Sequence, residues 1–407
     1  MRVLVVGSGG REHALAWKLA QSPRLEALHA APGNPGIARL GQCHPVRAED
    51  AEGLLGLCRE LAIDLAVVGP EAPLVAGLAD TLRHAGVAVF GPSREAARIE
   101  GSKTFAKDVL EAAGVPTAAR LSAARPPCVV KADGLAAGKG VFVCRTQDEL
   151  DRGLSAAAAL GDEVVIEELL EGEEVSLFVL TDGHEAMPLA PAQDFKRVGD
   201  GDTGPNTGGM GACSPVPGVD EPEVEELLET VHRPVLAELA RRGTPFAGLL
   251  YAGLMLTDDG TRVLEFNCRF GDPETQAILP RLEGDLLEAL AGVAAGALGS
   301  ELAVADRAAV TVVLAGSSYP ERNDSGTPID GVDEAEAAGA LVCHAGTARR
   351  GGTLVTNGGR ILNVTATGDD LVEARGAAYQ AVERISFAGM RFRRDIGLAA
   401  AEGHVRS

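Results

Sequence analysis

Short apolar runs alternate with helix-like segments over roughly the first hundred residues, and this alternation is the strongest constraint on the fold. "RVLVVG" precedes the helix-like "REHALAWKLAQS", and the runs "LEALHAAPG", "DLAVVGPE" and "VAVFGPS" each close on a Gly and a Pro. Such alternation is typical of parallel strands that helices cover on both faces. The pattern predicts a doubly wound parallel α/β domain over residues 1–103.

The pattern of predicted helices and strands changes after this region. The chain of 407 residues is long enough for two to four domains. "GSKTFAKDVLEAAGVPTA" predicts a helix that ends at Gly114. Beyond it, apolar strands with Gly and Asp turns surround a helix in "QDELDRGLSAAAAL", and a helix over 221–241 precedes the hairpin "GLLYAGLMLTDDGTRVLEFN". We expect an α+β central domain over 104–308 and a small mixed domain over 309–407.

One polar, glycine-rich segment, "QDFKRVGDGDTGPNTGGMGA", separates predicted elements of the central domain. It is too long for an ordinary connection, and long structureless loops in compact domains are usually functional. We expect a working loop here.

Charge and cysteine usage limit the partners and the compartment. The formal net charge of -21 disfavours nucleic acid and anionic membranes as partners. The 7 cysteines show no CxxC pair or metal-ligand spacing, which indicates reduced thiols in a cytoplasmic protein. No segment predicts a signal peptide or a membrane span.

The stretch "VVKADGLAAGKGVFV" places Lys131 before a glycine-rich turn. It is not a Walker loop, because only three residues separate Gly134 from Gly138 and Gly140 stands where Ser or Thr would hold magnesium. A glycine-rich hairpin tip can still wrap phosphates with backbone N–H groups beside the charge of Lys131. The alternative is an ordinary flexible hairpin.

Two acidic motifs follow apolar strands. In "EFNCRFGDPE", Glu265 and Asn267 share one face of a strand and offer oxygen ligands suited to Mg²⁺, while Arg269 offers a fork for a carboxylate or phosphate. The alternative is a solvated strand end with a surface ion pair. The acids of "VIEELLEGEEVS" predict either a solvated helix start or groups that bind adenine and ribose.

The N-terminal "GSGGREH" begins like a dinucleotide fingerprint, but Glu12 occupies the third glycine position. A nicotinamide site is therefore disfavoured. The glycine turn before a helix still suits a phosphate group, with Arg11 close by. We interpret His13 as a structural residue of the helix; the alternative is that it acts as a base.

Together the motifs resemble one family nearly end to end. "GSGGREHALAWK", "VVGPEAPLVAGL", "EGSKTFAKD", "VVKADGLAAGKGV", "EELLEGEEVS", "DFKRVGDGDTGPNTGGMGA", "EFNCRFGDPETQ", "HAGT" and "TNGGR" occur in the order found in phosphoribosylamine–glycine ligases of the ATP-grasp superfamily. The resemblance implies an ATP-grasp central domain with a mobile lid near 120–185. It also implies ligation of glycine to 5-phosphoribosylamine through glycyl phosphate, with ADP and phosphate released, in purine biosynthesis.

The resemblance also implies roles for individual residues. The residues that it implies bind ATP are Lys103, Lys131, Gly134, Gly138, Lys139, Gly140, Glu167, Glu168, Leu169 and Glu174. The residues that it implies bind the substrates are Gly9, Gly10, Arg11, Glu12, Glu71, Asp194, Lys196, Asn206, Thr207, Gly208, Gly209 and Arg269. The loop 194–211 is expected to close the site. It implies that Glu265 and Asn267 bind Mg²⁺ or Mn²⁺, and that Lys131, Arg269 and Asp272 are catalytic residues.

Two other functions remain open at this stage. The chain could be another ATP-grasp carboxylate–amine ligase, or a nucleotide-binding regulator that has lost turnover. We expect a single activity, a monomer, and small-molecule partners only. The segment before Val129 is short for the family, so the outer edge of the lid is expected to be trimmed.

Overall fold

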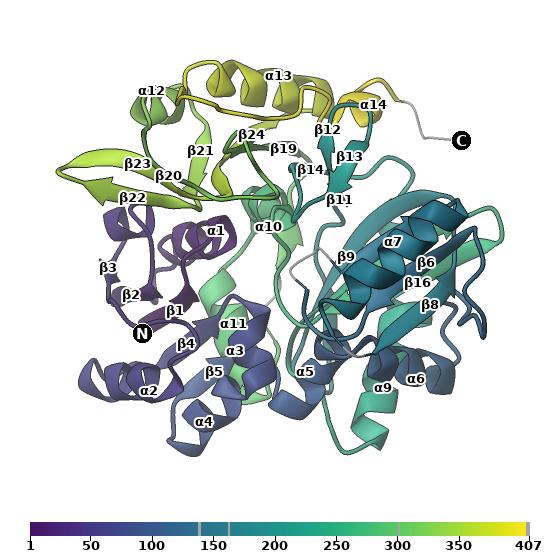
Figure 1. Cartoon of the computed structure of the whole chain (residues 1–407). Helices are drawn as coiled ribbons and strands as arrows, with labels where there is room; N and C mark the ends of the chain where they lie inside the picture. The colour runs from purple at the N-terminus through teal and green to yellow at the C-terminus, as the bar shows by residue number, and fades with distance from the viewer. Residues whose placement is uncertain (137–139, 162, 300–301, 404–407) are drawn as a thin grey trace.

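The computed structural model describes residues 1–136, 140–161, 163–299 and 302–403. Its N-terminal region holds a five-stranded sheet in the order β3-β2-β1-β4-β5, with every neighbouring pair parallel (Figure 1). The strands are β1 (Arg2–Gly7), β2 (Ala27–Pro32), β3 (Gln42–Cys43), β4 (Leu65–Val68) and β5 (Ala88–Phe90). The helices are α1 (Gly10–Leu19), α2 (Ala51–Glu60), α3 (Glu71–Ala76), α4 (Leu78–His84) and α5 (Arg94–Gly101), with a 3₁₀ turn, η1, at Ile37–Arg39. The predicted doubly wound parallel sheet is confirmed.

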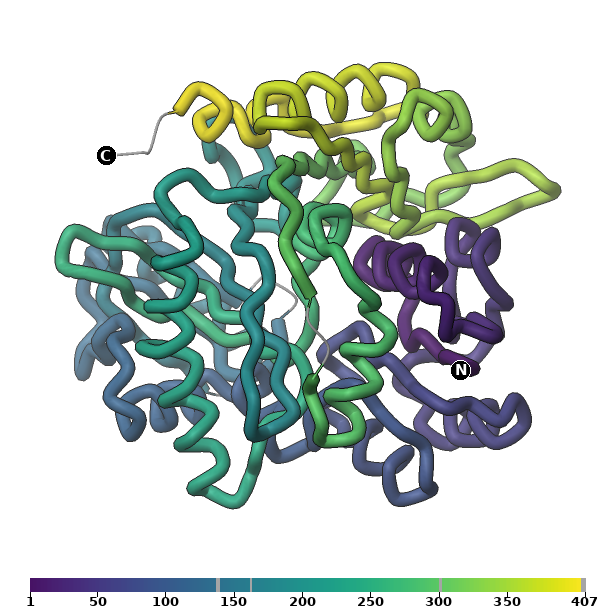
Figure 2. Tube along the Cα trace, turned by 180° about the vertical axis from the view of Figure 1, so that it is seen from behind, coloured from purple at the N-terminus to yellow at the C-terminus, as the bar shows by residue number. Residues whose placement is uncertain are grey.

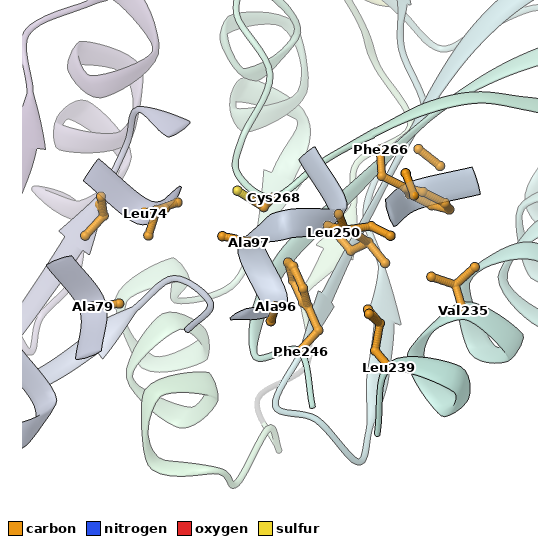
Figure 3. Close-up of a cluster of buried hydrophobic side chains, with 14 of the residues drawn as sticks. Leu74, Ala79, Ala96, Ala97, Val235, Leu239, Phe246, Leu250, Phe266 and Cys268 are labelled. Atoms are coloured by element: carbon orange, nitrogen blue, oxygen red, sulfur yellow. The ribbon is translucent and has the colours of Figure 1, made fainter. Parts of the chain in front are cut away.

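The burial of β1 explains this architecture. Val3 and Val5 belong to one buried cluster, whereas Leu4 and Val6 belong to another, and all four are fully buried. Since successive strand residues point to opposite faces, both faces of the sheet are covered. Figure 3 shows part of the second cluster, in which side chains of the N-terminal helices pack beside those of the central region.

The central region combines two sheets. One has the order β7-β6-β8 and carries α7; the other has the antiparallel order β10-β9-β15-β16. The elements are α6 (Lys103–Ala113), β6 (Cys128–Ala132), β7 (Val141–Cys144), α7 (Gln147–Ala158), β8 (Val164–Glu168), β9 (Glu173–Thr181), β10 (Ala186–Pro188), β15 (Gly248–Thr257) and β16 (Gly260–Asn267). As predicted, α6 ends at Gly114, which caps it with a φ of 68°.

The helix predicted over 221–241 has an irregular centre. It consists of α8 (Glu221–Leu227), a π-helical turn, η2 (Leu228–His232), and α9 (Arg233–Arg241). Pro234 lies in the first turn of α9 and has no N–H group to donate to the preceding turn. The helix therefore continues, but through a wider turn.

The expectation of a structureless loop over 193–212 is wrong. The segment contains β11 (Gln193–Asp194), β12 (Arg197–Gly199) and β13 (Thr203–Asn206), and its end begins β14 (Gly211–Ser214). β14 pairs with β19 in a sheet of order β11-β14-β19-β24-β21, so this segment completes the C-terminal sheet. The partner strand begins at Ala308, and no local pattern in a short Gly–Ala–Cys–Ser run predicts such a distant pairing.

The C-terminal region packs α13 over this sheet and lies against α1 of the N-terminal region (Figures 1 and 2). Its strands are β19 (Ala308–Ala315), β20 (Asp324–Pro328), β21 (Leu341–His344), β22 (Thr347–Arg350), β23 (Thr353–Gly358) and β24 (Arg360–Gly368), and its helices α12 (Val332–Ala337), α13 (Leu371–Val382) and α14 (Leu398–Ala401). Between it and the central region lie α10 (Glu274–Ile278), the 3₁₀ turn η3 (Leu279–Arg281), β17 (Leu282–Glu283), α11 (Leu286–Ala295) and β18 (Ala303–Val304). Among the described residues, no helix has both the length and the apolar character needed to cross a membrane.

Candidate active site

A cavity of about 610 Å³ lies where the three regions meet. The structure brings most of the predicted site residues to its wall: Arg11, Glu71, Lys103, Lys131, Gly134, Gly140, Glu167, Glu168, Leu169, Glu174, Asp194, Lys196, Asn206, Thr207, Gly208, Glu265, Asn267, Arg269 and Asp272. Gly9, Gly10, Glu12 and Gly209 are not in this wall. Gly138 and Lys139 lie outside the described residues.

A chain of buried charges forms one end of the cavity. The Lys131 ammonium lies 2.7 Å from one carboxylate oxygen of Glu167, and the Lys107 ammonium lies 2.9 Å from the other. Lys131 stands on β6 and Glu167 on the neighbouring β8, whereas Lys107 comes from α6. The side chains of Lys131, Glu167 and Lys107 are 9%, 2% and 4% exposed. Two ammonium groups and one carboxylate are therefore buried together, which leaves one net positive charge at this end of the cavity.

Lys103 joins α6 to the glycine-rich turn. Its ammonium donates to the carbonyl oxygen of Gly134 at 2.8 Å, and its backbone N–H donates to Asp133. Burial lowers the pKa of Lys103, while Glu265 and Asp133 oppose this effect. Gly134 has a φ of 92°, a conformation that favours glycine, so the turn leaves β6 sharply beside two cationic side chains.

The predicted adenine and ribose residues have protein partners of their own. Glu168 accepts the backbone N–H of Ala119 at 2.8 Å, which ties the end of β8 to the segment after α6. The Glu174 carboxylate forms an ion pair with Lys196. Both carboxylates still line the cavity together with Leu169.

Glu265 and Asn267 lie on β16 opposite Gly253 and Tyr251 of β15, two residues apart on one face. Burial would raise the pKa of Glu265, but Lys196, Lys131 and Lys103 lower it below its ordinary value. The carboxylate is therefore ionised, and none of the hydrogen bonds or ion pairs among the described residues uses it. Its free oxygens and the nearby Asn267 amide oxygen are hard donors that fit a divalent cation.

No group of three or more His, Cys, Asp and Glu side chains with metal-binding geometry occurs in the described part of the chain. A site of one carboxylate and one amide is nevertheless typical of Mg²⁺, which keeps several waters and completes its shell with substrate phosphates. The residues present therefore fit a metal that binds together with a phosphate ligand.

Arg269 uses most of its hydrogen-bonding capacity within the protein. It donates to Glu71 at 3.1 Å, to the Phe270 carbonyl at 3.2 Å, to Glu100 at 2.9 Å and to the Asn267 side-chain oxygen at 3.2 Å. Of the five N–H groups on an arginine, these bonds leave one for a ligand. The structure thus favours a single contact from Arg269 over the predicted two-pronged fork.

Glu71 and Glu100 neutralise this arginine from two helices of the N-terminal region. Burial would raise the pKa of Glu71, but Arg269 and Arg11 lower it to about 2. Burial raises the pKa of Glu100, although Arg269 opposes the effect. Glu100 also accepts the backbone N–H of Cys268 at 2.8 Å, so it fixes the strand end that carries Arg269.

A second cavity, of about 460 Å³, opens between the N-terminal glycine turn and the C-terminal region. Its lining residues are Ser8, Gly9, Pro32, Gly33, Asn34, Asp272, Ala345, Gly346, Thr347, Asn357 and Arg360. Asn34 connects the two sides, since its amide donates to the carbonyl oxygens of Ser8 and His344 at 2.8 Å each. The motifs "HAGT" and "TNGGR" therefore face the glycine turn.

Three residues predicted to bind substrate, Gly10, Glu12 and Gly209, line neither cavity. The Glu12 carboxylate accepts the Gly9 N–H at 2.6 Å and the Arg11 side chain at 2.6 Å, and its side chain is 3% exposed. A Cβ on Gly10 would lie 1.9 Å from the Asn363 amide nitrogen, and one on Gly209 would lie 2.3 Å from Pro273. In this structure these residues shape the turns beside the cavities and do not line them.

Sequence reasoning missed Lys107, Glu100, Tyr251, Glu274 and Arg360, all of which line the main cavity. Lys107 carried a signal, because it follows Lys103 by four residues and so shares its helix face. The Tyr251 hydroxyl donates to the buried Glu274 at 2.8 Å, a contact between β15 and α10 that no spacing rule predicts.

Comparisons with known proteins cover nearly the whole chain. Three family models of phosphoribosylglycinamide synthetase match: the N domain over 1–100, the ATP-grasp (A) domain over 101–275 and the C domain over 309–399. A phosphoribosylamine–glycine ligase of Streptomyces coelicolor is 53% identical over 98% of this chain and 100% of its own length. One from Rhizobium meliloti is 51% identical over 98% of this chain and 99% of its own.

A solved structure has the same fold. The crystal structure of phosphoribosylamine–glycine ligase from Thermotoga maritima matches with a TM-score of 0.83 and 36% identity, covering 97% of this chain and 100% of its own. The three family models together also span this chain from the N-terminal glycine turn to the C-terminal sheet. The chain therefore belongs to the phosphoribosylamine–glycine ligase family, the phosphoribosylglycinamide synthetases with an ATP-grasp central domain.

Proposed function

We propose that the protein joins glycine to 5-phosphoribosylamine at the expense of ATP, producing glycinamide ribonucleotide, ADP and phosphate for purine biosynthesis. The observation that carries the proposal is the single cavity in which a lysine-rich end, Glu265 with Asn267, and Arg269 converge. Family membership supports it, because the relatives at about half identity are named for this reaction.

The nucleotide binds at the lysine end in this proposal. Lys131 and Lys103 hold the phosphates, and Gly134 and Gly140 of the glycine-rich turn lie beside them. Glu168 and Leu169 place their backbone beside the adenine, and Glu174 reaches the ribose. The Glu167 side chain has a different role from its neighbours, because both of its oxygens pair with lysines.

A divalent metal, Mg²⁺ or Mn²⁺, would be held by Glu265 and Asn267 together with the ATP phosphates. When bound, it supplies positive charge that offsets the charge developing on the transferred phosphoryl group. Lys131 and Lys196, whose charges already act on Glu265, add to the same field.

Glycine binds next to this position. Arg269 and Asp272 face the glycine and the transferred phosphate, and the glycine carboxylate takes the remaining N–H of Arg269. Asp194, Lys196, Asn206, Thr207 and Gly208 form the wall that encloses it. Phosphoribosylamine enters from the second cavity, which Gly9 of the glycine turn lines, while Gly10 packs behind that turn and Arg11 supplies a positive charge from the wall of the first cavity. Glu12 and Glu71 hold Arg11 in this arrangement, with the longer contact, 3.8 Å, to Glu71.

The reaction then needs orientation more than a protein nucleophile. A glycine carboxylate oxygen attacks the γ-phosphorus and ADP leaves, which gives glycyl phosphate. The amine of phosphoribosylamine attacks the activated carbonyl carbon, a C–N bond forms, the C–O bond to phosphate breaks, and the nitrogen loses one proton. The enclosing wall keeps water from the activated carbonyl in the interval.

We further propose three units, 1–103, 104–308 and 309–407, in a monomeric cytoplasmic enzyme, with a lid near 120–185. The matching of separate family models to 1–100, 101–275 and 309–399 supports the division. Strands β11 and β14 from the second unit join the sheet of the third, so we expect these two units to unfold together.

A coupled assay for ADP tests the function. Purified protein, ATP, Mg²⁺, glycine and freshly made phosphoribosylamine should release ADP, and omission of either substrate should abolish the release. A panel of other carboxylates in place of glycine should be inactive; activity with one of them alone would indicate another carboxylate–amine ligase. Tight ATP binding without release under any condition would indicate a regulator and overturn the proposal.

A further inference from the structure

Arg360 of the "TNGGR" motif occupies a position that the proposed function leaves without a role. It begins β24 in the C-terminal sheet, yet its side chain lines both cavities. Asp272 is the one other residue shared by the two sets of lining residues in the described part of the chain. The Arg360–Asp272 ion pair, with 2.9 Å between nitrogen and carboxylate oxygen, is therefore the wall where the two cavities meet.

The guanidinium of Arg360 connects three segments that are distant in the sequence. It donates to the Asp272 side chain at 2.9 Å, to the Asp272 carbonyl oxygen at 2.8 Å, and to the carbonyl oxygen of Gly208. The planar fork of an arginine can make these bonds at once, whereas the point charge of a lysine cannot. With side-chain exposures of 20% for Arg360 and 16% for Asp272, the contacts are largely shielded from solvent.

The partners of Arg360 are themselves fixed. The second oxygen of the Asp272 carboxylate accepts from Gln276 at 2.8 Å, and the N–H of Gly208 donates to the Tyr319 hydroxyl at 3.0 Å. A Cβ on Gly208 would approach the Arg360 guanidinium carbon to 3.1 Å, so the close approach favours glycine there. The pair thus has a defined position relative to both cavities.

We propose that Arg360 is a positioning residue for the ligation step. It holds Asp272 and the turn at Gly208 in the wall across which the amine must reach the activated glycine. This inference rests on the proposed function, since it assumes that phosphoribosylamine occupies the second cavity and ATP with glycine the first. Loss of Arg360 would then impair the presentation of the amine and leave the nucleotide site unchanged, because Lys103 and Lys131 have other partners.

The test is steady-state kinetics of Arg360→Met and Arg360→Lys, after the wild type has been shown to need both glycine and phosphoribosylamine. For Arg360→Met we expect a KM for phosphoribosylamine at least about tenfold higher, because Asp272 and Gly208 would be misplaced relative to the bound amine. The KM for ATP should stay within about twofold, and more than one ADP should be released per product because water consumes part of the glycyl phosphate. Arg360→Lys should recover part of the loss.

Arg349→Met is the matched control, because Arg349 is exposed on β22 of the same region and lines neither cavity. It should behave as the wild type. Equal changes in the KM values for ATP and phosphoribosylamine, or one ADP per product in Arg360→Met, would overturn the proposal. Full recovery by Arg360→Lys would also overturn it, since the fork would then be unnecessary.

A double-mutant cycle covers the case in which Arg360→Met does not fold. Asp272→Asn keeps the shape of its side chain and removes the charge that Arg360 holds. If Arg360 acts through Asp272, Arg360→Lys combined with Asp272→Asn should lose no more than about the larger single effect. Additive losses would show that the two residues act independently and would refute the inference. A wild type that does not ligate at all would instead refute the proposed function.

Discussion

The two ends of the main cavity are built in different ways. The lysine end, Lys103, Lys107, Lys131 and Glu167, comes from α6 and the adjoining β6 and β8 of one region. The arginine end, Arg11, Arg269, Asp272 and Arg360, comes from the N-terminal helix α1, the segment after β16 and the C-terminal strand β24. The first end needs one folded unit, and the second needs all three regions assembled.

The contacts show what this difference implies. At the lysine end, Glu167 forms ion pairs with two cations of the same region. At the arginine end, Arg11 donates to the carbonyl oxygen of Phe270 at 3.1 Å, and Arg360 reaches across to Asp272. We therefore expect substitutions at the lysine end to change ATP use, and substitutions at the arginine end to change the use of phosphoribosylamine.

The largest effect should come from Glu265→Ala, because Glu265 lies between the two ends and serves both. Removal of this ligand should lower kcat by at least about 10²-fold, the order found when metal sites lose supporting groups. The fold should survive, since Glu265 makes no hydrogen bond among the described residues. The check is kcat with a parallel thermal melt; near-normal turnover at unchanged Tm would contradict the metal assignment.

Lys131→Met tests the lysine end alone. The substitution removes one charged contact to the phosphates, which predicts an ATP KM raised by about tenfold or more. The KM for phosphoribosylamine should change little. Initial rates over a matrix of both substrates give the two constants, and an unchanged ATP KM would refute the placement of the phosphates.

Lys107→Met separates structure from binding at the same end. Lys107 also donates to Thr117 at 2.7 Å, and its loss removes charged hydrogen bonds but leaves Glu167 paired with Lys131, so unfolding should become easier by about 1.5–3 kcal/mol. Adding Glu167→Gln should lower the stability further, because it removes the remaining counter-charge of the buried Lys131. Urea unfolding of the single and double variants measures both values; a double variant as stable as the single one would contradict the charge-triad description.

The same contrast determines what the sequence could predict. The parallel sheet, the end of α6 at Gly114, and the placement of Lys131 beside a glycine turn follow from local periodicity and turn chemistry. The resemblance to a known family supplied the other site residues. The role of Arg360 and the pairing of β14 with β19 depend on contacts between distant segments, and the inward turn of Glu12 depends on the cap of α1 that it forms with Gly9. No spacing rule encodes such contacts.

Gly10→Ala tests the arginine end by packing. The added methyl group would overlap the side chain of Asn363 and press on Gln276, so these buried side chains or α1 must shift. Overpacking of this kind costs about 1–3 kcal/mol. We expect that loss in urea unfolding and a KM for phosphoribosylamine raised by about threefold to tenfold. An altered ATP KM with normal use of phosphoribosylamine would contradict the division between the ends.

The smallest effect concerns acid stability. Because Arg269 and Arg11 lower the pKa of Glu71 from 4.5 to about 2 in the folded protein, its charge stabilises the fold above the unfolded pKa. This contribution is lost as the pH falls from about 4.5 to about 2. Glu71→Gln should therefore be less stable than wild type at pH 6, and the difference should shrink at pH 3. A difference independent of pH would contradict the ion pairing.

The central claim is that glycine is activated as its acyl phosphate before the amine attacks. Glycine labelled with ¹⁸O in both carboxylate oxygens gives the most direct test, with the released phosphate analysed by mass spectrometry. If the carboxylate attacks ATP and the amine then displaces phosphate, each phosphate should carry one ¹⁸O and the amide product should keep the other. Unlabelled phosphate released alongside product would contradict the account.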